Sequence, residues 1–336
     1  MKSLLMDREL TLTEMNEPGL TEGSLRIRVL MSAITGLDVD VASGRRPYTG
    51  IPGTCFVGEV EECRSEEGRA LVGSRVVGRS IYGCGMCDAC RLGHDERCRD
   101  RVRPGLFGAA GGQAEYIHLP RRAVAVVPRG VKDEAAVLSP LIAAIYDSLT
   151  HGQLPRWTNV LVVGDGGVGM LVALSLASAG YTVTLRGKHG DRFDLIRRHG
   201  IHFNLATDED EMNGVRPGRF GPALASYPFI FEATGQSGGW KAATHLVCPG
   251  GTIFMMSSCH DGVPRALTLV LDKSIRVLGL RQGPLEPVLN ILAAELFDPT
   301  EVVSRVYPFE EAAQAYANVS DRHERLALLR ISPRDD

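Results

Sequence analysis

Four cysteines close together in the chain have the residue type and spacing needed to hold a metal. The run is Cys84-Gly-Met-Cys87-Asp-Ala-Cys90, followed after seven residues by Cys98. Four thiolates at this spacing can surround one tetrahedral zinc ion. The alternative is a disulfide framework, which nothing else in the sequence favours. Because four thiolates leave no open coordination position, we expect one structural zinc per chain in a lobe over residues 84–98, with the chemistry elsewhere.

A second motif points to a bound dinucleotide. The apolar run Asn159–Val163 leads into Gly164-Asp-Gly166-Gly-Val-Gly169, and an apolar helical pattern follows. In this context the glycines permit a tight turn, close approach of a pyrophosphate and close packing of helix on strand. The N-terminus of the helix would offer N–H groups and a partial positive charge to phosphates. The alternative is a loop that is glycine-rich for other reasons. The predicted cofactor contacts here are Gly164, Gly166, Gly167, Val168 and Gly169.

The next expected strand distinguishes between the two nicotinamide cofactors. An NAD enzyme places an Asp or Glu at its end to bond the ribose 2′-hydroxyl. Here the strand ends Thr184-Leu-Arg-Gly-Lys-His189, with no acid and three basic side chains. Lys and Arg can pair with a 2′-phosphate, which a carboxylate would repel. The sequence therefore favours NADP(H) over NAD(H), unless these are solvated surface charges. The predicted contacts are Arg186, Gly187, Lys188 and His189.

The elements that must position these motifs are of two kinds, and the expected fold class is α/β. Residues 1–145 are rich in glycine and short β-type runs, which is typical of a β-rich, barrel-like domain. Residues 146–283 alternate apolar strands with helical stretches, which predicts a doubly wound parallel sheet with helices on both faces. The tail, 284–336, has two helical patterns and two short strands, and we expect it to pack onto the first domain.

The bulk composition excludes several classes of protein. A chain of 336 residues should hold about two domains, and its 44% apolar and 23% charged residues are ordinary for a globular protein. A net charge of −3 gives no electrostatic case for nucleic acid or an anionic membrane. No apolar stretch approaches a signal-peptide core or the roughly 20 residues of a membrane span. We expect a cytoplasmic protein that acts on a small-molecule substrate.

Together these features resemble the zinc-containing medium-chain dehydrogenase/reductase superfamily, which includes alcohol, sorbitol and threonine dehydrogenases. The four-cysteine spacing matches the structural zinc lobe of that family. Further matches along the chain are Gly73-Ser-Arg-Val-Val77, Gly112-Gln-Ala-Glu-Tyr116, Ser139-Pro-Leu141 and Glu232-Ala-Thr-Gly235. The resemblance implies a GroES-like catalytic domain over 1–145 and 284–336, a Rossmann domain over 146–283, and an active site in the cleft between them. It adds Ala233, Thr234 and Gly235 to the predicted cofactor contacts and implies a homodimer or homotetramer.

The sequence departs from this family at the catalytic zinc. Where the family has Cys-Gly-Thr-Asp-x-His, this chain has Thr35-Gly-Leu-Asp-Val-Asp40. Where the family has Gly-His-Glu, this chain has Gly53-Thr-Cys55, and Ser139 stands at the third ligand position. Threonine and serine hydroxyls are poor ligands for zinc at neutral pH. The resemblance therefore predicts an intact scaffold without the usual catalytic zinc.

Three functions remain compatible with these residues. In the first, a zinc-free NADP(H)-dependent oxidoreductase transfers hydride to or from an activated C=C, C=N or C=O, and side chains handle the charge. In the second, a shifted zinc bound by Cys55 and a neighbouring acid serves an alcohol dehydrogenase. In the third, the chain binds NADP(H) without catalysis. The predicted catalytic residues are Thr35, Asp38, Asp40, Thr54, Cys55 and Tyr146, with Tyr48 as a further candidate.

Overall fold

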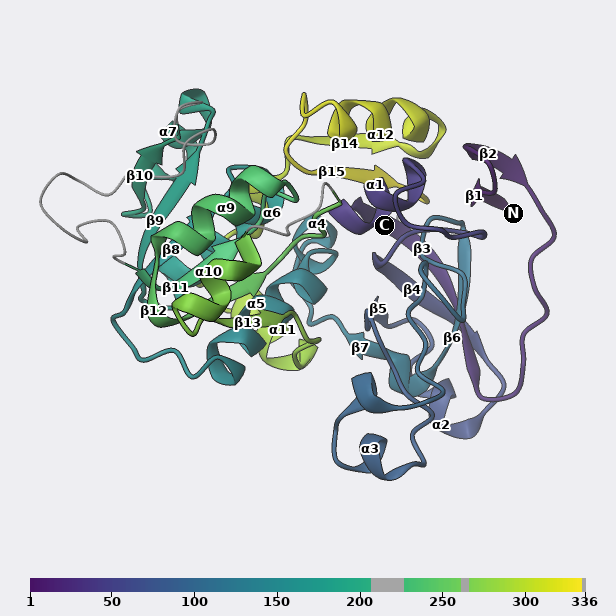
Figure 1. The fold of residues 1–336 in the computed structure, drawn as a ribbon. Coiled ribbons are helices and arrows are strands. Elements are labelled where there is room, and N and C mark those ends of the chain that lie inside the picture. The colour runs from purple at the N-terminus through teal and green to yellow at the C-terminus, as the bar shows by residue number, and fades with distance from the viewer. Residues whose placement is uncertain (207–226, 261–265, 334–336) are drawn as a thin grey trace, which may run out of the picture. The chain divides into compact units, whose positions relative to one another are not determined.

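The computed structural model describes residues 1–206, 227–260 and 266–333, and it divides the chain into two compact units. The first unit combines Met1–Ala143 with Gln282–Asp336, and the second is Ala144–Arg281 (Figure 1). The boundary falls inside helix α5, Ser139–His151, so no loop separates the two units at that point.

The first unit is built mainly from antiparallel strands. Its large sheet has the order β14-β15-β3-β4-β5-β7, and β6 pairs with another part of β3. A separate hairpin, β1-β2, completes the strands. The bounds are β1 Lys2–Met6, β2 Leu10–Glu14, β3 Ser24–Ile34, β4 Cys55–Cys63, β5 Arg75–Gly78, β6 Tyr116–Pro120, β7 Val124–Val126, β14 Arg305–Pro308 and β15 Ala327–Arg330.

The helices of the first unit are short. They are α1 Gly36–Ala42, α2 Glu66–Arg69, α3 Asp88–Arg91, α4 Asp133–Ala136, α11 Leu285–Ala293 and α12 Ala312–Ser320, with 3-10 turns at Asp95–Arg97, Arg121–Ala123, Pro299–Val302 and Phe309–Glu311. The tail adds β15 to the large sheet, where Ala327 is opposite Ile34 of β3. Its side chains join the core of the first unit: Tyr307, Phe309 and Leu329 are buried beside Ile27 and Phe56.

The second unit contains a six-stranded parallel sheet with the order β10-β9-β8-β11-β12-β13. The strands are β8 Asn159–Val163, β9 Thr182–Gly187, β10 His202–Leu205, β11 Tyr227–Glu232, β12 Val247–Met255 and β13 Arg276–Gly279. The helices are α6 Gly167–Ser178, α7 Phe193–Arg197, α9 Ser237–Leu246 and α10 Ala266–Asp272, and a 3-10 turn spans Gly190–Arg192.

Both faces of this sheet are covered, as the apolar strand patterns predict. Successive side chains of a strand point to opposite faces, and Val160, Leu161, Val162 and Val163 are all buried. Leu161 and Val163 pack with Trp240 of α9 in one apolar cluster. The predicted α/β fold class, with a β-rich domain and a parallel Rossmann-type sheet, is confirmed.

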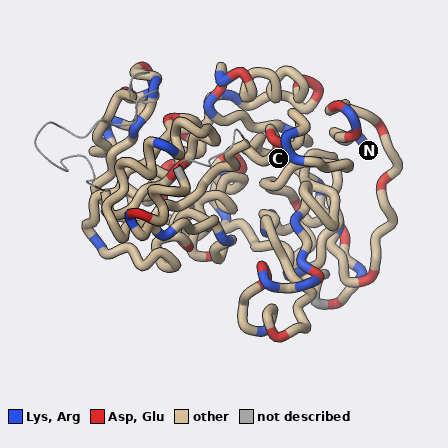
Figure 2. The backbone as a smooth tube through the Cα atoms, in the orientation of Figure 1, with Lys and Arg blue, Asp and Glu red and all other residues tan. Residues whose placement is uncertain are grey.

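Several elements were not predicted from the sequence. Among them are the β1-β2 hairpin, helix α1 and strand β10. Basic and acidic residues are interspersed along both units (Figure 2). Within the described residues, no helix is long and apolar enough to cross a membrane.

Candidate functional site

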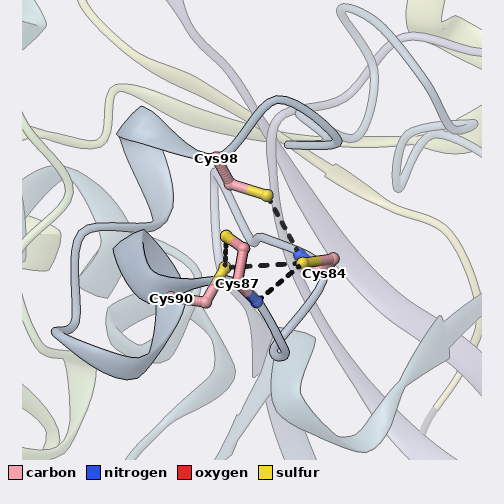
Figure 3. A group of neighbouring side chains, drawn as sticks. All are labelled: Cys84, Cys87, Cys90 and Cys98. Carbon is pink, nitrogen blue, oxygen red and sulfur yellow. Dashed lines mark hydrogen bonds between the residues drawn. The ribbon is translucent and has the colours of Figure 1, made fainter.

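The four cysteines of the lobe converge on one point (Figure 3). All four sulfur atoms lie within 4.8 Å of one another, and Cys90 Sγ is 4.0 Å from Cys84 Sγ and 3.5 Å from Cys87 Sγ. Zinc–sulfur bonds of about 2.3 Å in a tetrahedron place the sulfurs about 3.8 Å apart. The arrangement therefore fits one zinc ion, held by Cys84, Cys87, Cys90 and Cys98.

The backbone of the lobe favours a thiolate at Cys84. The N–H groups of Met86 and Cys87 each donate to Cys84 Sγ at 3.4 Å. These two bonds lower the pKa of the Cys84 thiol to about 6. Hydrogen bonds of this kind stabilise the charged form, which is the form that binds zinc. Across the residues described here, this is the one cluster of three or more His, Cys, Asp or Glu side chains arranged to hold a metal.

The glycine-rich loop has the geometry of a phosphate cradle. Gly164 has φ +116°, and a Cβ atom there would lie 2.9 Å from the carbonyl carbon of Ala233. A Cβ on Gly169 would lie 1.9 Å from the carbonyl oxygen of Gly164, so helix α6 can pack on β8 only with glycine there. Gly166 is the N-cap residue of α6, and no atom lies within 4 Å of the position that a Cβ would occupy there. The loop that carries Gly167 and Val168 therefore fits a dinucleotide pyrophosphate.

An acidic side chain from the glycine-rich loop, that of Asp165, lies at the end of strand β9. Asp165 is buried, and its Oδ2 accepts the N–H groups of Lys188 (2.9 Å) and His189 (2.7 Å). His189 Nδ1 lies 2.9 Å from the same oxygen, and Arg192 Nη1 lies 3.9 Å from Oδ1. A Cβ on Gly187 would lie 2.4 Å from Asp165 Cγ. The carboxylate therefore occupies the space that a side chain on Gly187 would fill.

Arg186 does not lie on the surface as a solvated charge. Its side chain is buried, and its guanidinium donates to Asn204 Oδ1 on the neighbouring strand β10. Lys188 and His189 follow it at the end of β9, where the Asp165 carboxylate fixes their backbone. The structure thus places the four predicted cofactor contacts, residues 186–189, at the end of β9. It also places Asp165 there, which was not predicted from the sequence.

The segment after β11 is organised by a buried glutamate. Glu232 Oε1 accepts the N–H of Thr234 at 2.8 Å and also its hydroxyl, while Oε2 accepts the hydroxyl of Ser257 at 2.8 Å. Burial raises the pKa of Glu232. Gly235 has φ +66° and donates its N–H to Ser257 Oγ at 2.8 Å. These contacts fix the Ala233–Gly235 turn beside Gly164, as the close approach of Gly164 to Ala233 shows.

In the first unit, Asp38 is the centre of a buried polar network. Its Oδ2 accepts the N–H (2.8 Å) and hydroxyl (2.6 Å) of Thr35, and its Oδ1 accepts the N–H groups of Gly53 (3.1 Å) and Thr54 (3.3 Å). The two threonine hydroxyls lie 3.3 Å apart. Burial raises the pKa of Asp38, although the four hydrogen bonds act in the opposite direction. Asp38 therefore joins the start of α1 to the start of β4.

Thr35 also has a structural role. It caps α1, and its pairing with Asp38 is a capping box in which each residue bonds the backbone of the other. The sequence contains the signal for this box, a threonine followed three residues later by an acid.

The remaining predicted catalytic residues have different surroundings. Cys55 is buried beside Thr54, and burial raises the pKa of its thiol to about 12. Asp40 forms an ion pair with Arg45 at 3.0 Å, and Tyr48 donates to the carbonyl of Ile51 at 2.8 Å. Ser139 is buried and donates to the carbonyl of Ala136 at 2.7 Å.

Tyr146 belongs to the second unit, where its hydroxyl lies 3.0 Å from Ser178 Oγ. Burial raises the pKa of Tyr146. The structure therefore joins Thr35, Asp38, Thr54 and Cys55 in one group, and it places Asp40 of α1 in an ion pair with Arg45, which follows the helix.

Comparisons with known proteins agree with both halves of this description. The family described as Alcohol dehydrogenase GroES-like domain matches residues 21–129, and Ketopantoate reductase PanE/ApbA matches residues 160–218. L-threonine 3-dehydrogenase of Paraburkholderia phytofirmans is 30% identical over 284 residues, covering 81% of this chain and 80% of that protein. Starvation-sensing protein RspB of Escherichia coli is 23% identical over 94% of each chain.

A solved structure shares the fold over the full length. Alcohol dehydrogenase TADH from Thermus sp. ATN1 superposes with a TM-score of 0.82 at 24% identity, covering 99% of this chain and 100% of that one. The long alignment with the threonine dehydrogenase, the GroES-like match and the shared fold agree with one another. The chain therefore belongs to the zinc-containing medium-chain dehydrogenase/reductase superfamily, whose members are NAD(P)-dependent, alcohol dehydrogenase-like oxidoreductases.

Proposed function

We propose that this chain is an NADP(H)-dependent oxidoreductase that transfers hydride to or from a small organic substrate without a catalytic zinc. The observation that carries this proposal is the Asp38 network. The two positions where the family has its Cys and His ligands are Thr35 and Thr54, and both are engaged by one buried carboxylate. An activated C=C, C=N or C=O is the expected substrate group, because such carbons accept hydride without a Lewis acid.

The chemistry of the neighbouring donors supports the absence of a catalytic metal. Cys55 is buried, and its Sγ lies 3.9 Å from the Thr54 hydroxyl. Both oxygens of Asp38 already accept hydrogen bonds, and Asp40 is paired with Arg45. The alternative of a shifted zinc on Cys55 would therefore need rearrangement of several buried contacts.

The network can handle a proton in place of the metal. Thr54 Oγ1, Thr35 Oγ1 and Asp38 Oδ2 form a chain with steps of 3.3 and 2.6 Å. A hydroxyl at the end of such a chain can donate a hydrogen bond to developing negative charge on a substrate oxygen or nitrogen. Asp38 lies at the inner end of this chain and accepts the Thr35 hydroxyl, so it can orient the two threonine hydroxyls. The nicotinamide supplies the hydride when the cofactor is bound.

The preference for NADP(H) is supported by the end of β9. Gly187 stands where NAD enzymes have an acid, and Lys188, His189 and Arg192 surround it. The N–H groups and cations there suit a 2′-phosphate. They are shared with Asp165, which would have to give up part of its bonding when a phosphate enters.

The domain roles, location and assembly follow the same proposal. We assign catalysis to residues 1–145 and 284–336 and NADP(H) binding to residues 146–283, with the cysteine lobe as a structural zinc site. The chain would act in the cytoplasm, where thiols remain reduced for zinc. It would assemble as a homodimer or homotetramer.

Zinc content tests the central claim. The purified protein is loaded with zinc, washed with chelator and measured by elemental analysis, with a Cys55→Ala variant as a matched control. One zinc per chain in both proteins is the expected result. Two per chain in the parent and one in the variant would refute the proposal and favour the zinc-dependent alcohol dehydrogenase. One zinc per chain without hydride transfer to any activated substrate would favour a non-catalytic NADP(H)-binding protein.

A further inference from the structure

Two arginines lie beside the Asp38 network without an acidic partner. Arg103 begins a turn in which its N–H and carbonyl bond Phe107 at 3.0 and 2.9 Å. This turn packs against the segment that precedes β4 and contains Thr54. A Cβ on Gly105, within the turn, would lie only 2.9 Å from the backbone nitrogen of Gly53. Arg46 follows helix α1, and its N–H donates to the carbonyl of Asp40 at 2.9 Å. Both arginines therefore come from segments that border the predicted catalytic residues.

The electrostatics of the pair are unfavourable without a ligand. Val41 of α1 and Leu106 of the turn after Arg103 pack in one apolar cluster, so the segments that carry Arg46 and Arg103 are adjacent. Burial lowers the pKa of Arg103, and the positive charges of Arg46 and Arg101 lower it further. The Nε atoms of Arg46 and Arg103 are buried and have no hydrogen-bond partner. In the described part of the chain, neither side chain forms an ion pair, whereas Arg45 pairs with Asp40 and Arg75 with Asp133.

An uncompensated, partly buried cation is costly, and two adjacent ones cost more. A protein retains such a pair where a ligand supplies the missing negative charge. Guanidinium groups suit this task because their planar N–H groups match the oxygens of carboxylates and phosphates in pairs. The turn that begins at Arg103 approaches the backbone of Gly53, next to Thr54, so an anion held here would lie beside the residues of the network.

We propose that Arg46 and Arg103 bind the anionic group of the substrate, a carboxylate or a phosphate ester, next to Thr54 and Cys55. Its role as a substrate subsite rests on the proposed function, whereas the anion site itself rests on the first unit alone. The reacting carbon would then belong to a small molecule that carries its negative charge a few bonds away. The same two positive charges disfavour a metal cation at Cys55.

Titration calorimetry on the full chain tests this proposal, with saturating NADP⁺ present to fill the cofactor site. The probes are glycerol 3-phosphate, glycerate and neutral glycerol. The variants are Arg46→Gln, Arg103→Gln and the double substitution, and Arg69→Gln on the exposed end of α2 is the control for loss of one positive charge. We expect one or both anions to bind and glycerol not to bind. Each single variant should weaken anion binding at least 10-fold, the double variant should abolish it, and Arg69→Gln should leave it unchanged.

Thermal unfolding provides a second measurement that does not require turnover. Inorganic phosphate should raise the melting temperature of the parent protein and of Arg69→Gln but not that of the double variant. Without phosphate, the double variant should melt at the parent temperature or above it, because a repulsive pair has been removed. Equal anion binding by parent and double variant, or no anion binding by the parent, would overturn the proposal. Anion binding without any hydride transfer would instead refute the proposed function and leave the anion site standing.

Discussion

Asp165→Asn is the substitution with the most specific expected effect on cofactor choice. In the parent, Asp165 Oδ2 accepts the N–H groups of Lys188 and His189 and lies 2.9 Å from His189 Nδ1. A 2′-phosphate entering at the end of β9 competes for the same donors and is repelled by the same charge. Asparagine has a similar shape and can still accept the two backbone N–H groups, but it carries no charge.

The magnitude follows from the bonds that change. Three donors lie within hydrogen-bond distance of Asp165 Oδ2. A hydrogen bond to a charged oxygen is more stabilising than one to a neutral oxygen by about 1 kcal/mol. Part of this gain is lost to solvent because His189 is 39% exposed, which leaves about 1–2 kcal/mol in favour of the phosphate. The dissociation constant of NADPH should therefore fall about 5- to 30-fold. That of NADH should change less than about 3-fold, because NADH brings no phosphate to this position.

The assay is titration calorimetry of the parent and the variant with NADPH and NADH, and 2′,5′-ADP and 5′-AMP serve as probes of the adenosine half. Asp165→Ala is the companion variant. It removes the acceptor as well as the charge, so it should loosen residues 187–189 and lower the melting temperature of the protein. If Asp165→Asn left the ratio of NADPH to NADH affinity unchanged, or shifted it toward NADH, Asp165 would not compete with the phosphate and the reasoning would be wrong.

Three further predictions concern the Asp38 network, the end of β9 and the cysteine lobe. Thr54→Val keeps the shape of the side chain but removes the outer hydroxyl of the chain of hydrogen bonds. Turnover should therefore fall at least about 10-fold, while calorimetry shows unchanged NADPH affinity. Unchanged turnover would show that Thr54 has no role in the mechanism. Lys188→Ala should weaken NADPH binding about 5-fold or more and NADH binding much less, and equal effects would contradict the cofactor preference. Cys98→Ser removes one ligand of the closed site, so elemental analysis should find clearly less than one zinc per chain, and the melting temperature should fall. Full zinc retention in this variant would show that Cys98 is not a ligand.

The motifs that depend on local spacing could be predicted from the sequence. The four cysteines come from one short stretch, so their spacing alone determines that they meet. The glycine-rich loop likewise combines a strand, a turn and a helix that are consecutive in the chain. The parallel sheet follows from buried apolar runs such as Asn159–Val163, because such runs suit strands covered on both faces.

The polar contacts across the fold could not be predicted in this way. Asp165 reaches Gly187 only because β8 and β9 are paired in parallel, with Val163 opposite Arg186. The turn after Arg103 reaches Gly53 because the chain beyond the cysteine lobe returns to this point, where Gly105 packs on the Gly53 backbone. Each of these contacts joins residues that are far apart in sequence, and its existence depends on strand register and turn geometry.

The place of β15 in the first sheet has a consequence for the order in which the protein can fold during synthesis. Ala327–Arg330 pairs with Met31–Ile34 of β3, and Ile34 directly precedes Thr35. On the ribosome, all of residues 144–281 emerge before this strand exists, so the second unit can be complete while part of β3 still has an unpaired edge. The segment at Thr35, for which we propose a catalytic role, therefore reaches its final backbone pairing only near the end of translation. A chain that stops before residue 327 would keep the second unit and lose the strand that supports the segment at Thr35.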